Sequence, residues 1–89
     1  MKFKVFTVYD DKVEAFLQPF FNPTRGAAIR AFADTCNDPN TAFNKHPADY
    51  TLFEIGDYDD EKGYIEMYDA KHGIGTALEF IEANKGNDQ

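Results

Sequence analysis

Residues 2–9 read Lys-Phe-Lys-Val-Phe-Thr-Val-Tyr, and this segment constrains the fold more than any other. Side chains in a β-strand alternate between two faces, so the odd-numbered and even-numbered residues separate. The odd-numbered face holds Phe3, Val5, Thr7 and Tyr9, and the even-numbered face holds Lys4, Phe6 and Val8. Bulky groups on both faces are typical of a strand that is central in a sheet or that meets a partner on one side. The segment therefore predicts a sheet built around the N-terminus.

The rest of the chain predicts three more strands and two helices. A polar turn over 10–12 leads to a second hairpin arm over 13–17, and Pro19 either ends that arm or restricts it to a sheet edge, because proline has no amide proton. A helix begins at an Asn22-Pro23 cap and runs to about Asn37. The later elements are a helical turn over 41–44, strands over 50–58 and 64–68 joined at Gly63, and a second helix after Gly75 with Thr76 and Glu79 at capping-box spacing.

The order of these elements, β-β-α-β-β-α, predicts the α+β class: an antiparallel four-stranded sheet with two helices packed on it. A length of 89 residues fits a single domain. We assign this domain to residues 1–84. The polar residues 85–89 are expected to form a disordered tail.

Charge is distributed unevenly along the chain. Lys and Arg number 9 against 16 Asp and Glu, which gives a net charge of −7. Residues 1–45 are close to neutral, whereas residues 46–89 hold eleven acids against three lysines. An acidic chain of this kind argues against a generic binder of the phosphate backbone, which needs a dense Lys/Arg footprint. A solvated acidic surface, a two-sided binding molecule and a DNA mimic built from the acids of 54–69 all stay open.

Two further features bear on location. No apolar run approaches the roughly 20 residues that span a bilayer, so we expect no membrane partner. Cys36 is the single cysteine and cannot form an internal disulfide, which suits a reducing cytoplasm.

The residues that usually carry chemistry do not form a catalytic or metal site. Cys36, His46 and His72 lack zinc-ligand spacing, and the acids of 57–63 lack the glycine and glutamate positions of a calcium loop. The chain has no serine, and Cys36 falls on the apolar stripe of the first helix, where a thiol is inert. We therefore predict no catalytic residue, no bound metal, no cofactor and no enzymatic activity.

Nucleic-acid binding is the functional pattern with some support among the residues. Sites for single-stranded DNA combine aromatic stacking surfaces with a basic track. The candidate residues are Lys2, Lys4 and Phe6 on the first strand and Arg25 and Arg30 on the first helix. The competing interpretation is that the aromatic residues build the core and the cations only solvate it.

Several segments together resemble one family of phage proteins. They are KFKVFTVYD (2–10), KVEAFLQPFF (12–21), GAAIRAF (26–32), NDP (37–39), F-x-KHP-x-DYTLF (43–53) and G-x-YD (56–59). With these strings the chain resembles the small nonstructural protein of gokushovirus-type microviruses, bacteriophages with single-stranded DNA genomes. The resemblance implies a DNA-binding protein that acts in single-strand DNA synthesis or genome packaging in the host bacterial cytoplasm.

Two functional hypotheses follow. In the first, an accessory protein binds single-stranded DNA, or the phage replication or procapsid proteins on it, through the cations and Phe6. In the second, a protein–protein adaptor makes no contact with nucleic acid. It binds itself or another protein through an aromatic patch of Phe16, Phe20 and Phe21. A homodimer is expected under both hypotheses, because a chain this short has a modest core.

Overall fold

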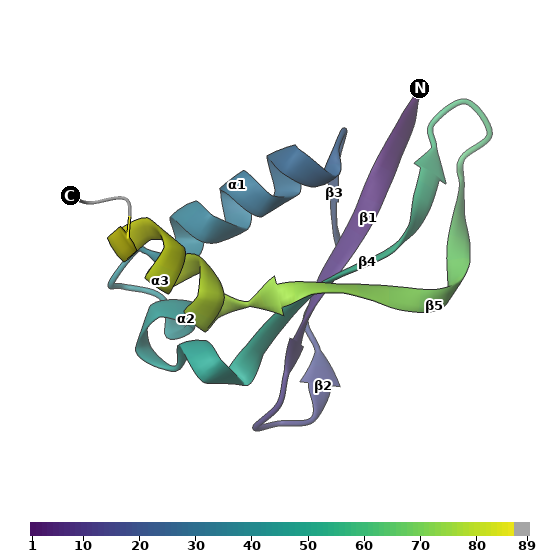
Figure 1. Cartoon of the computed structure of the whole chain (residues 1–89). Helices are drawn as coiled ribbons and strands as arrows, with labels where there is room; N and C mark the ends of the chain where they lie inside the picture. The colour runs from purple at the N-terminus through teal and green to yellow at the C-terminus, as the bar shows by residue number, and fades with distance from the viewer. Residues whose placement is uncertain (87–89) are drawn as a thin grey trace.

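The computed structural model describes residues 1–86, in which an antiparallel sheet is combined with three α-helices (Figure 1). In chain order the elements are β1 (Lys2–Asp10), β2 (Ala15–Phe16), β3 (Phe20–Asn22), α1 (Arg25–Cys36), α2 (Ala42–Lys45), the 3-10 helix η1 (Pro47–Asp49), β4 (Tyr50–Asp59), β5 (Tyr64–Thr76) and α3 (Ala77–Gly86). The α+β class with an antiparallel sheet is confirmed. The short α2 lies where the sequence predicts a helical turn.

The sheet has the strand order β2-β1-β4-β5, and β3 pairs with the same edge of β1 as β2 does. In the register Tyr9 lies opposite Phe16 and Phe6 lies opposite Phe20, so β2 and β3 form one edge strand with one extra residue between them. Pro19 falls in this bulge, where a missing amide proton costs no ladder hydrogen bond. The predicted hairpin arm over 13–17 is confirmed at Ala15–Phe16, whereas Val13 and Glu14 belong to the turn and pairing resumes after Pro19.

The start of α1 differs from the prediction. The cap is Thr24, whose side-chain oxygen accepts a hydrogen bond from the Ala27 amide at 3.0 Å. Asn22 instead ends β3, where it pairs with Lys4. The sequence offers two adjacent cap-forming residues, and strand pairing decides between them. The helix ends at Cys36 with Asn37 as its C-cap, close to the predicted end.

At the other end of the chain, β5 runs eight residues further than predicted and reaches Thr76. The predicted capping box then starts α3: the Thr76 amide donates to Glu79 Oε2 at 2.8 Å and the Glu79 amide donates to Thr76 Oγ1 at 3.3 Å. Helix α3 includes Lys85 and Gly86. Residues 87–89, the rest of the predicted tail, lie outside the described residues.

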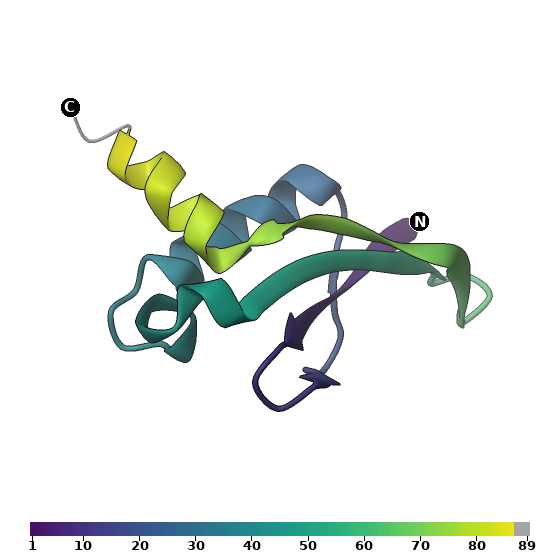
Figure 2. The ribbon, with the colours of Figure 1, turned by 60° about the horizontal axis from the view of Figure 1, so that its bottom comes forward.

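The hydrophobic core lies between the sheet and two of the helices, α1 and α3. In the turned view of Figure 2, α3 continues from the end of β5 and lies beside α1. Phe6, Val8 and Leu52 face the helices from β1 and β4, and each is nearly inaccessible to solvent. Phe32 and Cys36 meet them from α1. Burial raises the pKa of the Cys36 thiol to about 11, so the predicted inert thiol agrees with its place in the core.

Candidate functional site

The sheet has a covered face, which packs on the helices, and an open face, on which the described residues place no helix. Directly opposed residues of antiparallel strands project to the same side, so the register defines each face. The open face carries Phe3, Val5, Thr7 and Tyr9 from β1, Phe16 and Phe21 from the edge strand, Phe53 and Tyr58 from β4, and Ile65 and Met67 from β5.

Aromatic side chains form two groups at opposite ends of the open face. In the first group, the Tyr58 ring lies 6.5 Å from Phe3 and 5.3 Å from Phe21 between centroids.

In the second group, the Phe16 ring lies 4.7 Å from Tyr9 and 5.9 Å from Phe53. Between the groups Val5 and Thr7 are buried. The solvent-exposed part of the face is therefore provided by the rings at its two ends, while the side chains in the middle of β1 are covered by their neighbours.

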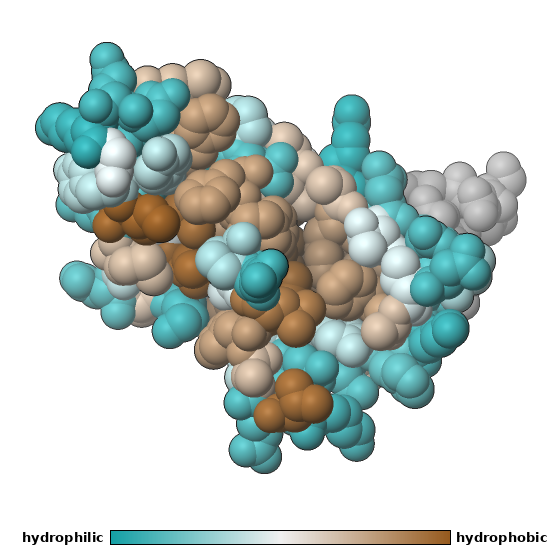
Figure 3. Space-filling view, turned by 180° about the vertical axis from the view of Figure 1, so that it is seen from behind, coloured by the Kyte–Doolittle hydropathy of each residue, from teal (hydrophilic) through white to brown (hydrophobic). Residues whose placement is uncertain are grey.

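Much of this apolar surface meets solvent. Phe16 and Phe21 are each 45% exposed and Met67 is 55% exposed. Seen from behind, brown hydrophobic side chains extend across the middle of the molecule and teal ones surround them (Figure 3). A contiguous apolar surface with a polar rim is typical of a binding site rather than of a solvent-facing sheet.

One cation approaches the open face. Residues 68–71 of β5 have no partner on β4, since Glu54 pairs with His72 and Gly56 pairs with Met67. This irregular stretch coincides with the sharply bent course of β5 in Figure 1 and brings Lys71 Nζ to 5.5 Å from the Phe16 ring centroid. The pair is a cation–π contact at an exposed edge.

The covered face holds an ionic centre beside the apolar core. The Glu54 side chain on β4 is 3% exposed, and its Oε1 accepts a hydrogen bond from Arg25 Nε at 2.7 Å. Lys4 Nζ lies 3.9 Å from the other carboxylate oxygen and 3.1 Å from Asp57 Oδ1. Two cations from β1 and α1 therefore neutralise two carboxylates from β4.

The irregular stretch of β5 completes the ionic centre. The Tyr68 hydroxyl donates to Glu54 Oε2 at 2.5 Å and lies 3.1 Å from Asp57 Oδ1. His72 stacks on the Tyr68 ring at 4.7 Å and places Nδ1 3.4 Å from Arg25 Nη2. The ionic centre thus joins the bent strand to the sheet and to the first turn of α1.

The protonation of Glu54 follows from these contacts. Burial alone would raise its pKa, but hydrogen bonds from Tyr68 and Arg25 and the charges of Arg25 and Lys4 outweigh burial and lower it. Burial and the neighbouring carboxylates raise the pKa of Tyr68. Glu54 is ionised and Tyr68 neutral at neutral pH. This assigns both residues a structural role, because neither is poised to exchange a proton.

The structure does not support the predicted roles of three nucleic-acid candidates. Phe6 has no exposed surface, so a base could stack on it only if the core opened. Lys4 and Arg25 do lie close together, on either side of Glu54, but both are engaged with carboxylates. A phosphate would have to compete with those carboxylates, and the local charge is balanced.

The other two candidates lie apart from each other. Lys2 is exposed at the start of β1, opposite Asp59. Arg30 is exposed on α1, in a shallow hollow that also includes Asp34. The five candidate residues therefore do not combine into a basic track with an aromatic platform.

The structure places two of the three residues of the predicted protein-binding patch on one exposed face. Phe16 and Phe21 lie on the open face, whereas Phe20 projects to the covered side and stacks on Phe6 at 5.7 Å.

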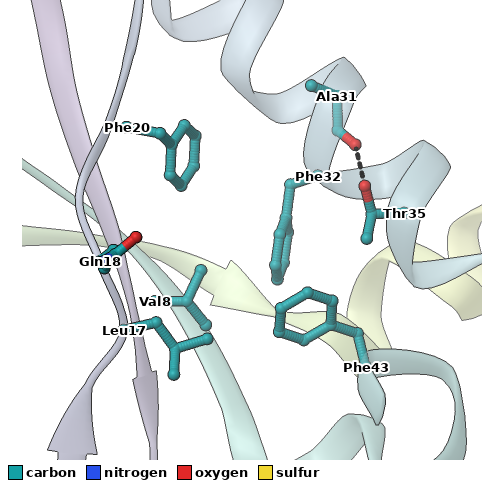
Figure 4. A pocket seen from close by; sticks show the side chains of 8 residues that line it. All are labelled: Val8, Leu17, Gln18, Phe20, Ala31, Phe32, Thr35 and Phe43. Carbon is teal, nitrogen blue, oxygen red and sulfur yellow. Dashed lines mark hydrogen bonds between the residues drawn. The ribbon is translucent and has the colours of Figure 1, made fainter. Parts of the chain in front are cut away.

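Phe20 also lines a groove of about 270 Å³, where it faces Phe32 and Phe43 from the helices (Figure 4). The bulge at Leu17–Pro19 allows Phe20 and Phe16 to take opposite sides. Sequence reasoning did not include Phe3, Tyr9, Phe53 and Tyr58 in this patch. The alternation of residues 2–9 placed Phe3 and Tyr9 on one face, whereas Phe53 and Tyr58 join it only through the pairing of β4 with β1.

Among the side chains that the structure describes, no three or more from His, Cys, Asp and Glu are grouped in a way suited to a metal ion. In the described part of the chain, no helix combines the length and apolar character needed to cross a membrane.

The comparisons with known proteins give one match. A family model described as Phage ORF5 protein matches residues 3–80, which is most of the chain and includes the whole open face. The curated proteins and the solved structures contain no significant match.

Proposed function

Because the chain belongs to the Phage ORF5 protein family, a family of phage proteins, we propose that it is a non-enzymatic accessory protein that acts by binding protein through the open face. The observation that carries this proposal is the exposed aromatic surface on a sheet whose opposite side packs its apolar residues against the helices. Hydration of such a surface is unfavourable in the isolated molecule. This free-energy cost is removed only when a partner covers the surface.

The resemblance of residues 2–59 to gokushovirus-type nonstructural proteins supports a more specific role. We place this protein in the host cytoplasm during single-strand DNA synthesis or genome packaging, as an adaptor on the replication or procapsid proteins. Its acidic balance suits contact with proteins that handle DNA, because such proteins are basic on the surfaces that hold phosphate.

Charge decides between protein and nucleic acid as the occupant of the open face. Binding of single-stranded DNA combines stacking with a basic groove that follows the backbone. The open face has aromatic rings but one nearby cation, Lys71, which already lies over Phe16. A protein surface needs no such track, so the apolar, nearly uncharged face fits a protein better.

The direct test is capture of partners from infected cells, with nuclease added before recovery. We expect specific phage or host proteins to stay bound after nuclease treatment and to be lost with Phe16→Asp or Phe21→Asp. Leu78→Asp is the matched control, since Leu78 is 38% exposed but lies on α3, across the sheet. Recovery that is unchanged in both open-face variants would contradict the proposal.

A titration of a labelled oligonucleotide by fluorescence anisotropy measures the alternative. Counterion release makes binding of nucleic acid strongest at low salt. We expect no saturable binding there. The contrary result is tight binding at low salt that weakens with added salt and disappears in Phe16→Asp. It would show that the open face binds single-stranded DNA and would overturn the assignment to protein.

A further inference from the structure

We propose that the occupant of the open face is a second copy of this chain, so that the protein works as a symmetric dimer with two sheets packed face to face. This inference rests on the proposed function, since it names the partner that the same face binds. Four features of the described residues support a copy over a foreign partner: the arrangement of the rings, the area of the face, the shape of the protomer and the placement of charge.

The arrangement of the rings is self-complementary. A two-fold axis across the middle of the face, between its two aromatic groups, brings the Tyr58 end of one protomer onto the Phe16 end of the other. The aromatic group at the Tyr58 end of one protomer then packs on the aromatic group at the Phe16 end of the other. The two-fold symmetry repeats this contact at the opposite end of the interface. Aromatic pairs between sheets add to the free energy of apolar burial, because ring edges and faces attract each other.

The area of the face is sufficient for a specific dimer. Strand β1 has nine residues, which makes the face about 30 Å long at the usual rise per residue. Four strands side by side make it about 19 Å wide. Two such faces in full contact bury at most roughly 1,100 Å², close to the ~1,000 Å² expected of a biological interface.

The protomer is less compact than a domain of its size. Its radius of gyration is 13.7 Å and its exposed area is 5,796 Å². A compact domain of this length and mass has values of about 12 Å and about 5,300 Å². Packing two sheets at their open faces gives four layers, helix–sheet–sheet–helix, in which each sheet is covered on both sides.

The charges lie where they permit self-association. Two chains of charge −7 repel each other, but the residues of the open face are uncharged and Lys71 is the cation beside them. The acids of the β4–β5 turn, Asp59, Asp60 and Glu61, lie at the rim, where solvent and salt screen them. Added salt should therefore strengthen the dimer slightly, the reverse of its effect on binding to DNA.

Light scattering coupled to size exclusion measures the mass of the species in solution. We expect about twice the 10.1 kDa of one chain at concentrations on the order of 100 μM. Phe16→Asp and Phe21→Lys should each weaken association more than about 100-fold and give the mass of one chain, because each places charge against rings. Leu78→Asp should remain a dimer. Circular dichroism with thermal unfolding checks that all three variants fold.

A mixing experiment tests the two-fold arrangement itself. In the proposed dimer Phe16 of one protomer approaches Phe21 of the other, so equal amounts of Phe16→Asp and Phe21→Lys should form a mixed dimer. One contact in it then pairs aspartate with lysine and the other pairs the two native rings. Failure of the mixture to associate, with the wild type dimeric, would overturn this arrangement.

The outcomes separate this inference from the proposed function. A wild type with the mass of one chain at every concentration and salt overturns the dimer. If Phe16→Asp then still loses its nuclease-resistant partner, the open face binds a foreign protein and the proposed function stands. A dimer that dissociates in the open-face variants supports the inference, and unchanged capture of phage proteins by those monomers would show that the function lies elsewhere.

Discussion

On the covered face of the sheet, Phe6 and Leu52 have no exposed surface, whereas on the open face Phe16 and Phe21 leave nearly half of theirs in solvent. Both faces are rich in large apolar groups, so hydrophobicity does not distinguish them. Charge does: Lys4, Glu54 and Asp57 all project to the covered face, where Arg25 completes the balance.

This difference separates the two uses of apolar surface. The side chains of the covered face stabilise the folded protomer. Its charges are paired, because an unpaired buried carboxylate would be destabilising. The open face contributes less to the stability of the protomer and remains free to bind. Substitutions on the covered face should therefore change the free energy of unfolding, and those on the open face should change association.

The largest expected effect is the contrast between Phe6→Ala and Phe21→Ala. Phe6→Ala should lower the free energy of unfolding by about 3–5 kcal/mol, because it leaves a cavity in the core. Phe21→Ala should cost under about 1 kcal/mol in the protomer, since the ring is half in solvent. Urea unfolding of both variants at equal low concentration measures the difference. Equal losses would mean that the two faces do not differ in this way.

Gly56→Ala sharpens the comparison on the open face itself. A Cβ at this position would lie 2.5 Å from the backbone oxygen of Glu66, so β5 would have to move away from β4. We expect a loss of about 1–3 kcal/mol, typical of overpacking, because Gly56 is buried and the new methyl group would meet the backbone of β5. Thermal unfolding measures it, with Gly26→Ala as a control whose Cβ would have 3.9 Å of room. A neutral Gly56→Ala would show that β5 adjusts freely.

Glu54→Gln tests the ionic centre through its pH dependence. The folded pKa of Glu54 lies below its ordinary value of 4.5, so the stability it supplies is present above that value and is lost as pH falls through the folded pKa. We expect Glu54→Gln to cost about 1–2 kcal/mol near neutral pH and much less near pH 3. Asp60→Asn at the exposed turn is the control. A constant loss at all pH values would contradict the lowered pKa.

The smallest expected effect is that of Lys71→Ala beside the open face. Loss of an exposed cation–π contact should cost about 0.5–1 kcal/mol of protomer stability. It should also uncover more of the Phe16 ring, so binding of an apolar dye should rise rather than fall. Lys62→Ala in the β4–β5 turn controls for the change in net charge. A fall in dye binding would show that Lys71 is part of the binding surface rather than a cover over it.

Local patterns predicted much of this fold. The alternation of residues 2–9, the stripe that includes Phe32 and Cys36, and the Thr76–Glu79 capping box concern neighbours in sequence. Backbone geometry alone relates such neighbours. These predictions are confirmed. The bulge at Pro19 and the long course of β5 escaped prediction because they depend on pairing with β1 and β4.

The candidate site shows the same division. Phe16 and Phe21 were predictable as an exposed aromatic pair. Phe20, between them and chemically identical to Phe21, turns inward because the bulge shifts the alternation by one residue. Lys4 and Arg25 read as free cations, since the carboxylates that neutralise them lie 29 or more residues away along the chain.

The sequence by itself determined that two faces of a strand would both be apolar, and that the chain would be acidic and form an antiparallel sheet with helices. It could not decide which face the helices would cover, because periodicity is the same for both sides of a strand. Only the tertiary structure made that choice. Packing α1 and α3 on the side of Phe6 buried the residue nominated for DNA and left the opposite rings in solvent, where a partner can reach them.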